Sequence, residues 1–266
     1  MIINDKKFSI IRYSSGELKL KHEMLKSYIE NNVANILYDG EGLSLFELFI
    51  LCKYFISEGI KTNLTLAYLP YQRMDHNNGI EVETVKIVAD LFNELKLDSL
   101  KICEPHCDLS YFDNAQKINL VDKIYKKVIK QIGFDESKDV VVFTDKGSYQ
   151  KFNSLGKNRL FASKERDIKT GLISSYNLSG EINPEQKIII VDDIISSGDT
   201  LIETLKEIKK RTSTKVDIIC GHFENNLYNT RLFELKQVNH IYASNSLVKS
   251  GNDKLILFNV EGLVNG

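Results

Sequence analysis

The sequence predicts an α/β protein in which mostly parallel sheets are flanked by helices. Short apolar runs alternate with amphipathic stretches, and several runs are β-branched and apolar at consecutive positions, as in strands buried on both faces. The segments expected to form strands are 64–69, 100–103, 140–143, 159–162, 187–191, 216–220, 240–243 and 255–258. Apolar residues at helical spacing predict helices over 43–57, 82–95 and 201–211.

Composition narrows the class of protein. The chain has 266 residues and 42% are apolar, which is enough for a packed core. The net charge of -1 gives no reason to expect a nucleic-acid or membrane partner. Four irregularly spaced cysteines do not form a disulfide framework, and no segment resembles a signal peptide or reaches the roughly 20 apolar residues of a membrane span. We therefore expect a cytoplasmic globular protein.

The length suits two domains. The polar segment 130–138 is the expected boundary, which gives an N-terminal domain over residues 1–130 and a C-terminal domain over 131–266. The last expected strand, 255–258, could return to the first domain. Pro70 and Pro105 come shortly after strands and mark the carboxyl edge of a sheet, where open α/β proteins bind ligands.

The clearest functional pattern is KIIIVDDIISSGDT, residues 187–200. A buried strand leads into two carboxylates, a loop follows, and a helix is expected to begin at Thr200. Glycine lets successive backbone N–H groups turn inward, hydroxyls add donors, and the helix N-terminus attracts anions, so the loop suits a sugar phosphate. The residues expected to bind the ribose phosphate are Asp192, Asp193, Ser196, Ser197, Gly198, Asp199 and Thr200.

This block resembles the PRPP-binding motif of the phosphoribosyltransferase fold. The resemblance implies phosphoribosyltransferase-like domains, with the phosphate on the loop and the vicinal ribose hydroxyls donating to Asp192 and Asp193. Asp199 departs from the motif, because relatives have glycine or a basic residue there. Its carboxylate either repels a phosphate dianion or points outward as a helix cap, and the sequence leaves both open.

The first half resembles the ribose-phosphate diphosphokinases (PRPP synthetases). The segment YLPYQRMDH, residues 68–76, is similar to the family's P-Y-x-R-Q-D block, which contacts ATP. Residues 13–17, YSSGE, are similar to the F-x-D-G-E loop that reaches into a neighbouring subunit's ATP site, so the resemblance implies a homo-oligomer, a dimer or a multiple of one. The ATP-binding residues that it implies are Arg73, Asp75, His76, Tyr13 and Glu17.

The same resemblance implies a magnesium site. His106 matches the family's metal-site histidine, and Asp145, in VVVFTDKG, matches its metal-site aspartate. Cys103 and Cys107 flank His106, but two cysteines and one histidine make a poor zinc site. Mg²⁺ is therefore the expected cofactor, with ATP as co-substrate.

Residues 161–167, FASKERD, resemble the family's catalytic stretch, so Lys164 and Arg166 are the expected catalytic residues. The resemblance runs from residue 13 to about residue 262 and implies transfer of the β,γ-diphosphate of ATP to the anomeric hydroxyl of ribose 5-phosphate, which yields PRPP and AMP. The two residues would stabilise charge on the transferring group.

Three alternatives remain open. The same reaction could use a larger 5-substituted ribose such as ADP-ribose, as part of NAD metabolism. Asp199 would oppose that acceptor less, because each of its phosphates has a single charge. The chain could also be a phosphoribosyltransferase that consumes PRPP, or a non-catalytic homologue associated with an active synthetase.

Overall fold

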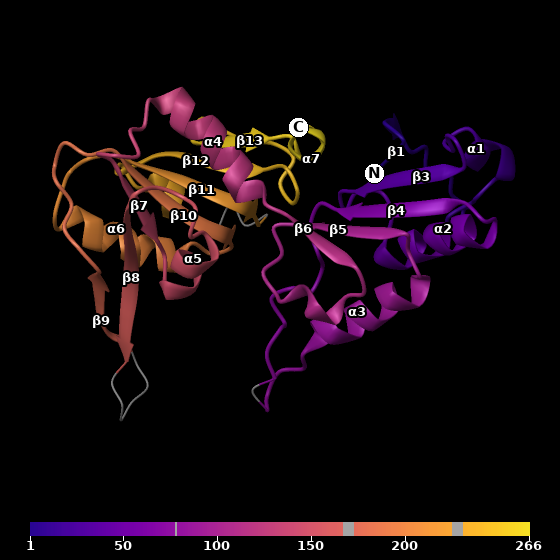
Figure 1. Cartoon of the computed structure of the whole chain (residues 1–266), viewed down its shortest axis with the longest axis horizontal. Coiled ribbons are helices and arrows are strands. Elements are labelled where there is room, and N and C mark those ends of the chain that lie inside the picture. The colour runs from indigo at the N-terminus through magenta and orange to yellow at the C-terminus, as the bar shows by residue number, and fades with distance from the viewer. Residues whose placement is uncertain (78, 167–172, 225–230) are drawn as a thin grey trace. The chain divides into compact units, whose positions relative to one another are not determined.

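A computed structural model describes residues 1–77, 79–166, 173–224 and 231–266, with residues 164–166 and 173–175 described by their backbone. The chain divides into two compact units, Met1–Ile118 and Asn119–Gly266. Each unit is built on a sheet of its own (Figure 1). Most strand pairs in both sheets are parallel, which confirms the predicted α/β class.

The N-terminal unit has a six-stranded sheet in the order β2-β1-β3-β4-β5-β6. Its strands are β1 (Ile2–Ile3), β2 (Lys6–Lys7), β3 (Val33–Tyr38), β4 (Lys61–Leu66), β5 (Ser99–Cys103) and β6 (Ala115–Ile118). Strands β3 to β6 are parallel, and β1 and β2 form an antiparallel edge. Its helical elements are α1 (His22–Lys26), α2 (Leu45–Ser57), α3 (Thr84–Leu95) and the 3-10 helix η1 (Leu109–Tyr111).

Local signals explain where α2 and α3 begin and end. The Ser44 hydroxyl accepts the N–H of Glu47 at 3.2 Å, and the Glu47 carboxylate accepts the N–H of Ser44 at 2.8 Å, which forms a capping box. Helix α3 ends where Lys96 adopts a left-handed φ of 57°. Its apolar stripe, from Val85 to Leu95, is buried, as the helical spacing predicts.

The C-terminal unit has a seven-stranded sheet in the order β13-β12-β11-β10-β7-β8-β9. Its strands are β7 (Val140–Phe143), β8 (Asn158–Arg166), β9 (Ile173–Leu178), β10 (Ile188–Ile195), β11 (Val216–Phe223), β12 (Val238–Ser244) and β13 (Leu255–Phe258). Its helical elements are α4 (Leu120–Ile132), α5 (Lys146–Lys151), α6 (Asp199–Lys209), η2 (Arg231–Glu234) and α7 (Val260–Asn265). The pairing of β8 with β9 is antiparallel, and the other strand pairs are parallel.

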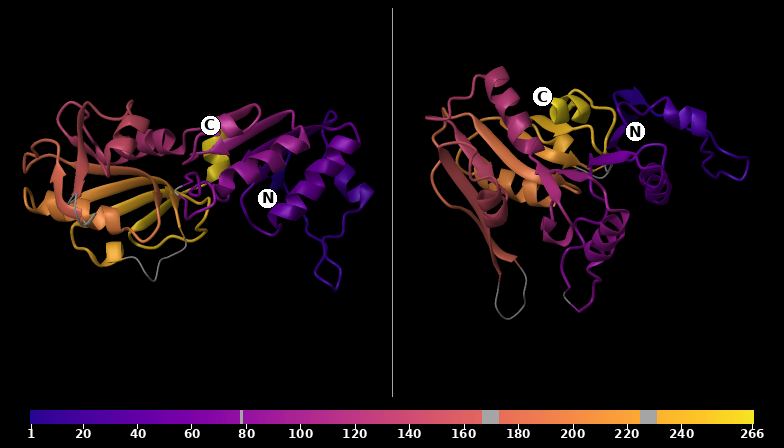
Figure 2. Two further views of the ribbon diagram at one scale, coloured as in Figure 1. Left: turned by 90° about the horizontal axis from the view of Figure 1, so that it is seen from below. Right: turned by 45° about the vertical axis from the view of Figure 1, so that its right-hand side comes forward.

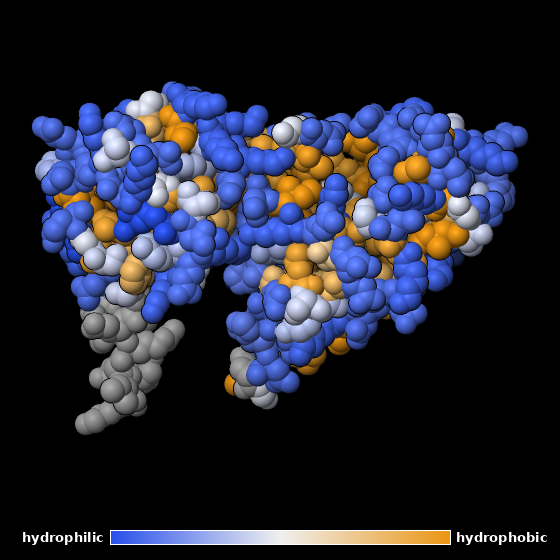
Figure 3. All heavy atoms as spheres, in the orientation of Figure 1, coloured by the Kyte–Doolittle hydropathy of each residue, from blue (hydrophilic) through white to orange (hydrophobic). Residues whose placement is uncertain are grey.

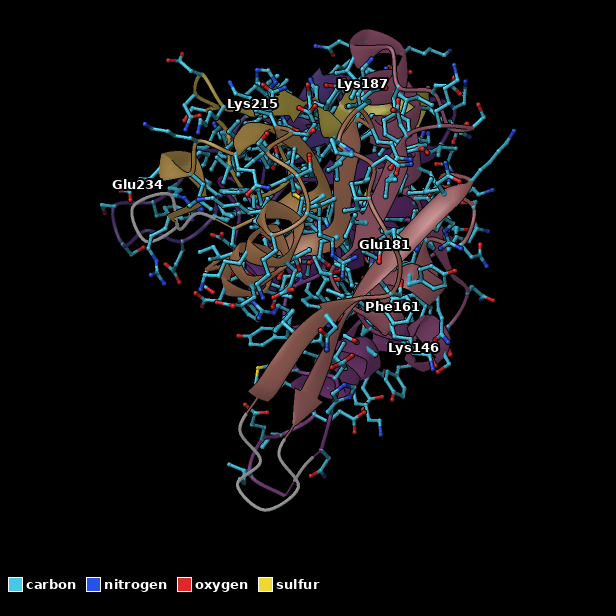
Figure 4. The ribbon with its side chains drawn as sticks, turned by 90° about the vertical axis from the view of Figure 1, so that its left-hand side faces the viewer. Lys146, Phe161, Glu181, Lys187, Lys215 and Glu234 are labelled. Atoms are coloured by element: carbon cyan, nitrogen blue, oxygen red, sulfur yellow. The ribbon has the colours of Figure 1, made fainter. Side chains whose placement is uncertain are left out.

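Helices cover both faces of this second sheet (Figure 2). Leu201 and Leu205 of α6 belong to the same buried cluster as Ile188 and Ile190 of β10. Helix α4 contacts β10, β11 and β12. Lys187, which precedes β10, donates from Nζ to the backbone oxygen of Ile132 at 2.8 Å, so the start of β10 is tied to the end of α4 (Figure 4).

Two expectations about organisation are corrected. The boundary predicted at residue 130 falls inside α4, and this helix belongs to the second unit because it packs on that unit's sheet. The last strand does not return to the first domain. It pairs in parallel with β12, where Ile241 faces Leu255 and Ser244 faces Phe258.

Apolar residues gather on several parts of the surface of the N-terminal unit (Figure 3). Among the described residues, every exposed large hydrophobic side chain belongs to this unit, including Phe46, Ile50, Ile87 and Leu91 on α2 and α3. Within the described part of the chain, no helix combines the length and the hydropathy that crossing a bilayer requires.

Candidate functional site

The acidic pair lies within β10. The strand continues through Asp192 and Asp193 to Ile195, because β11 goes on pairing with it: Asp192 faces Cys220 and Ile194 faces His222. The loop is therefore shorter than expected, and α6 begins at Asp199 rather than Thr200. Gly198 between them has a φ of 79°, a left-handed conformation that favours glycine, so the chain turns directly from strand into helix.

The two carboxylates have different partners. Oδ2 of Asp192 accepts the Thr144 hydroxyl at 3.0 Å, and Oδ1 accepts the N–H of Asp193 at 2.9 Å. Lys151 Nζ lies 2.6 Å from Oδ2 of Asp193, with only 22% and 11% of the two side chains exposed.

Burial raises the pKa of the Asp192 carboxyl, and the negative charge of Asp193 raises it further. The hydrogen bonds from Thr144 and from the Asp193 N–H act in the opposite direction because they stabilise the ionised form. Asp192 is therefore a carboxylate whose ionisation is opposed by its surroundings, beside a second one neutralised by a lysine.

One short segment holds both carboxylates. Thr144 directly follows β7, Asp145 is the N-cap of α5, and Lys151 is the last residue of α5. Asp145 Oδ1 accepts the N–H of Ser148 at 2.7 Å and its hydroxyl at 3.1 Å, so this aspartate is also a helix cap. In Figure 4, Lys146 and Phe161 mark the start of α5 and the adjacent strand β8. Sequence reasoning selected Asp145 and missed Thr144 and Lys151, which have no motif of their own.

Asp199 faces outward, and its role as a helix cap is wrong. Gly198 occupies the cap position, and the Asp199 side chain makes no capping bond. Its side chain is 70% exposed and lies 3.7 Å from the Arg231 guanidinium. It also accepts the Ser197 hydroxyl at 2.6 Å, so one of the expected phosphate donors already has an acceptor. Ser196 and Thr200 are partly buried at the same turn.

In the N-terminal unit, the turn after β4 presents the expected ATP-binding residues. Tyr71 has a φ of 66°, and the Met74 N–H donates to its oxygen at 2.9 Å. Arg73 is exposed. The Asp75 side chain is 14% exposed, and the His76 ring, which is 83% exposed, lies 3.5 Å from it.

The turn after β5 presents His106. The imidazole is exposed, and the backbone N–H donates to Oε1 of the buried Gln72 at 2.7 Å. Two residues earlier, the fully buried Glu104 adopts a left-handed φ of 39° and lies 3.1 Å from Lys117 Nζ. Because β4 and β5 are parallel neighbours, the turns after them lie at one edge of the sheet.

Residues 13–17 form a hairpin turn. The Tyr13 N–H donates to the Glu17 oxygen at 3.0 Å, and Gly16 has a φ of 93°. Arg12 fastens the hairpin to α2, since its guanidinium binds both carboxylate oxygens of Glu47 and donates to the Gly42 oxygen at 2.7 Å. The bond from Arg12 lowers the pKa of Glu47 to about 2. The Tyr13 ring remains 53% exposed.

The expected catalytic residues lie in β8, whose backbone pairs Lys164 with Tyr176 of β9. The side chains of Lys164 and Arg166 lie outside the described part of the structure.

The side-chain atoms of the two expected metal-site residues can be compared with the ligands that Mg²⁺ prefers. Asp145 offers the carboxylate oxygen that Mg²⁺ prefers, and the exposed His106 offers a nitrogen, which suits Mg²⁺ less directly. Among the described residues, no three His, Cys, Asp or Glu side chains converge. The residues therefore fit an ion that is bound mainly by phosphate oxygens and water, as Mg²⁺ is in phosphoryl-transfer sites.

Known proteins of similar sequence and fold belong to the family that the sequence motifs resemble. The family model described as phosphoribosyl transferase domain matches residues 109–241. A ribose-phosphate pyrophosphokinase of Sulfolobus acidocaldarius is 29% identical over 207 residues, which cover 74% of this chain and 70% of the relative. One from Sulfurisphaera tokodaii is 27% identical over 234 residues, 79% of each chain. The crystal structure of phosphoribosylpyrophosphate synthetase from Mycobacterium smegmatis superposes with a TM-score of 0.74 at 19% identity, over 96% of this chain and 87% of that one.

Proposed function

Since the chain belongs to the phosphoribosyl transferase domain family, as a transferase of the ribose-phosphate pyrophosphokinase type, we propose that it transfers diphosphate from ATP to the C1 hydroxyl of ribose 5-phosphate, giving PRPP and AMP. The observation that supports this most is the end of β10. There, two differently held carboxylates lead through the left-handed Gly198 into the N-terminus of α6. This arrangement suits a diol next to a phosphate.

In this proposal the C-terminal unit binds the sugar phosphate. Asp192 and Asp193 accept hydrogen bonds from the ribose hydroxyls, and the turn over residues 196–200 with the start of α6 binds the 5-phosphate. Lys164 and Arg166 stabilise negative charge on the transferring phosphoryl group. Such chemistry needs little covalent participation by the protein, so orientation and charge neutralisation supply most of the rate.

The N-terminal unit binds ATP through Arg73, Asp75 and His76, with Tyr13 and Glu17 contributed by a neighbouring subunit. The anchoring of the hairpin by Arg12 supports this role, because it holds Tyr13 outward. Exposed apolar side chains on α2 and α3 of the same unit are consistent with a homo-oligomer. Asp145 in the C-terminal unit and His106 in the N-terminal unit are each proposed as a ligand of Mg²⁺, which would neutralise phosphate charge when bound.

The test is a paired assay with mass detection. Purified protein, Mg²⁺ and ATP are incubated with ribose 5-phosphate or with ADP-ribose. AMP release together with the mass gain of one diphosphate on ribose 5-phosphate is the expected result. AMP release with neither acceptor would contradict the proposal and favour a PRPP-consuming transferase or a non-catalytic homologue.

Lys164→Ala provides a second test. We expect the variant to fold normally and to lose about 10²–10³ in kcat, by analogy with the loss of one donor to a developing charge. Circular dichroism checks the fold, and AMP release checks turnover. Near wild-type turnover would show that Lys164 does not stabilise the reacting group.

One observation favours a second candidate, the same transfer to ADP-ribose. The exposed Asp199 carboxylate lies at the start of α6 and binds the Ser197 hydroxyl, so the loop presents a negative charge and has one donor engaged. A 5-phosphate dianion is repelled there more than the singly charged phosphates of ADP-ribose. A mass gain on ADP-ribose alone would support this candidate.

A further inference from the structure

Gln72 is buried although its neighbours are exposed. It lies in the turn after β4, between Tyr71, which is 52% exposed, and Arg73, which is also exposed. The Gln72 side chain has no exposed area. A carboxamide in such a place loses its contact with water, and this loss must be offset by hydrogen bonds. Residue 72 is also the position that the P-Y-x-R-Q-D pattern leaves open, so the resemblance gives it no role.

One half of the carboxamide links two turns. Oε1 of Gln72 accepts the backbone N–H of His106 at 2.7 Å, from a residue 34 positions later in the chain. The turn with Arg73 and Asp75 and the turn with His106 follow the parallel neighbours β4 and β5. A single side chain therefore fixes the backbone of the expected metal-site residue against the expected nucleotide-binding turn.

The other half has no partner. Nε2 of Gln72 is buried, and it has no hydrogen-bond partner among the described residues. Reversing the amide would put its NH₂ group against the N–H of His106, which is also a donor, so the orientation is determined. A fully buried donor without an acceptor is uncommon in folded proteins. The backbone of both turns is strained: Tyr71, in the turn after β4, has a left-handed φ of 66°, and Glu104, in the turn after β5, has one of 39°. Backbone strain of this kind is found most often at binding sites.

We propose that Gln72 is a positioning residue for the nucleotide and metal site. Through Oε1 it holds the backbone of His106 in register with the turn over residues 71–76, so the two turns present their side chains together. This inference rests on the proposed binding of ATP by that turn.

The experiment separates the two halves of the side chain in the full-length protein. Gln72→Met keeps the length of the side chain and removes the hydrogen bond to the His106 N–H. Gln72→Glu keeps an oxygen acceptor for His106 and removes the unpaired donor. Asn93→Leu is the matched control, because this carboxamide also joins backbone groups of the same unit, the Tyr111 oxygen at 2.9 Å and the Asp113 N–H at 2.7 Å.

Three quantities are measured: amide hydrogen exchange at His106 in the unliganded protein, affinity for Mn²⁺ without nucleotide, and affinity for ATP by calorimetry. We expect Gln72→Met to exchange about tenfold faster and to bind Mn²⁺ and ATP about tenfold more weakly, the effect of one lost hydrogen bond. Gln72→Glu should keep all three within about twofold of wild type, because its carboxyl oxygen still accepts the N–H of His106. Asn93→Leu should leave all three within about twofold.

Two results would overturn the inference: unchanged exchange at His106 in Gln72→Met, or an equal loss of ATP affinity in Asn93→Leu. If Gln72→Met does not fold, Gln72→Glu decides, because the N–H of His106 should stay protected where the acceptor oxygen is kept, and a loss of that protection would overturn the inference. A wild-type protein that binds no ATP would overturn the proposed function instead. In that case a loss of Mn²⁺ affinity in Gln72→Met supports the positioning of His106, and an unchanged affinity refutes it.

Discussion

Replacing Lys151 by methionine removes the cation from Asp193 and keeps the length of the side chain. The pair has an N–O distance of 2.6 Å, and 22% and 11% of its side chains are exposed. Losing one partner of a fully buried pair costs about 3–5 kcal/mol, because a charge remains buried without a counterion. Some solvent reaches this pair, so we expect Lys151→Met to lower the free energy of unfolding by about 2–3 kcal/mol.

The double variant Lys151→Met/Asp193→Asn isolates the charge. Because it leaves no unpaired carboxylate, we expect it to be more stable than Lys151→Met alone, with a coupling of about 1.5–2 kcal/mol. Lys206→Met is the matched control. Its partner Glu203 also lies at 2.6 Å, but the side chains are 60% and 42% exposed, so the loss should be about 0.3–0.5 kcal/mol.

Equilibrium urea unfolding of the full chain measures five proteins: wild type, Lys151→Met, Asp193→Asn, the double variant and Lys206→Met. The slope of the free energy against urea is required to stay constant. The reasoning is refuted if Lys151→Met costs no more than Lys206→Met. It is also refuted if the two single changes add to the double variant within about 0.5 kcal/mol.

Three further predictions concern charge and backbone. The raised pKa of Asp192 means that the native state keeps a proton which the unfolded chain has lost above about pH 4, so the free energy of unfolding falls as pH rises. We therefore expect Asp192→Asn to have a free energy of unfolding about 1–2 kcal/mol above that of wild type at about pH 8, with a smaller difference at about pH 5, as measured by urea unfolding. Glu47→Gln keeps the capping box and loses the Arg12 ion pair, so acid titration should show it less stable than wild type above about pH 4, with the gap closing as pH falls through the Glu47 pKa of about 2. Gly198→Ala, at a φ of 79°, should cost about 1–2 kcal/mol in thermal unfolding and weaken ribose 5-phosphate binding in calorimetry.

Much of the fold could be predicted because the buried strands are apolar at consecutive positions. All eight expected strands are present, and β10 is one example, with Ile188–Val191 fully buried. Strand β3 was missed although its pattern of burial alternates, because Asn35 interrupts the apolar run of VANILY. Strand β6 was missed because AQKI, with two exposed residues of four, has little apolar periodicity.

The candidate site could be predicted only where its residues lie next to one another in a sequence motif. The acidic pair and Gly198 are contiguous, so their arrangement follows from one strand and one turn. Thr144 and Lys151 meet that pair from 48 and 42 residues away, and Gln72 meets His106 from 34 residues away. No local pattern encodes such contacts, because they depend on which strands become neighbours in the sheet.

Residues 144–151 contact both aspartates, and this has a consequence for chimeras between this chain and its relatives. A crossover between β7 and β10 would separate Asp192 and Asp193 from the hydroxyl and the ammonium that hold them. A chimera with its breakpoint there takes the two carboxylates from one parent and the segment that contacts them from the other. Exchange of the whole block 140–209, from the start of β7 to the end of α6, keeps both contacts within a single parent.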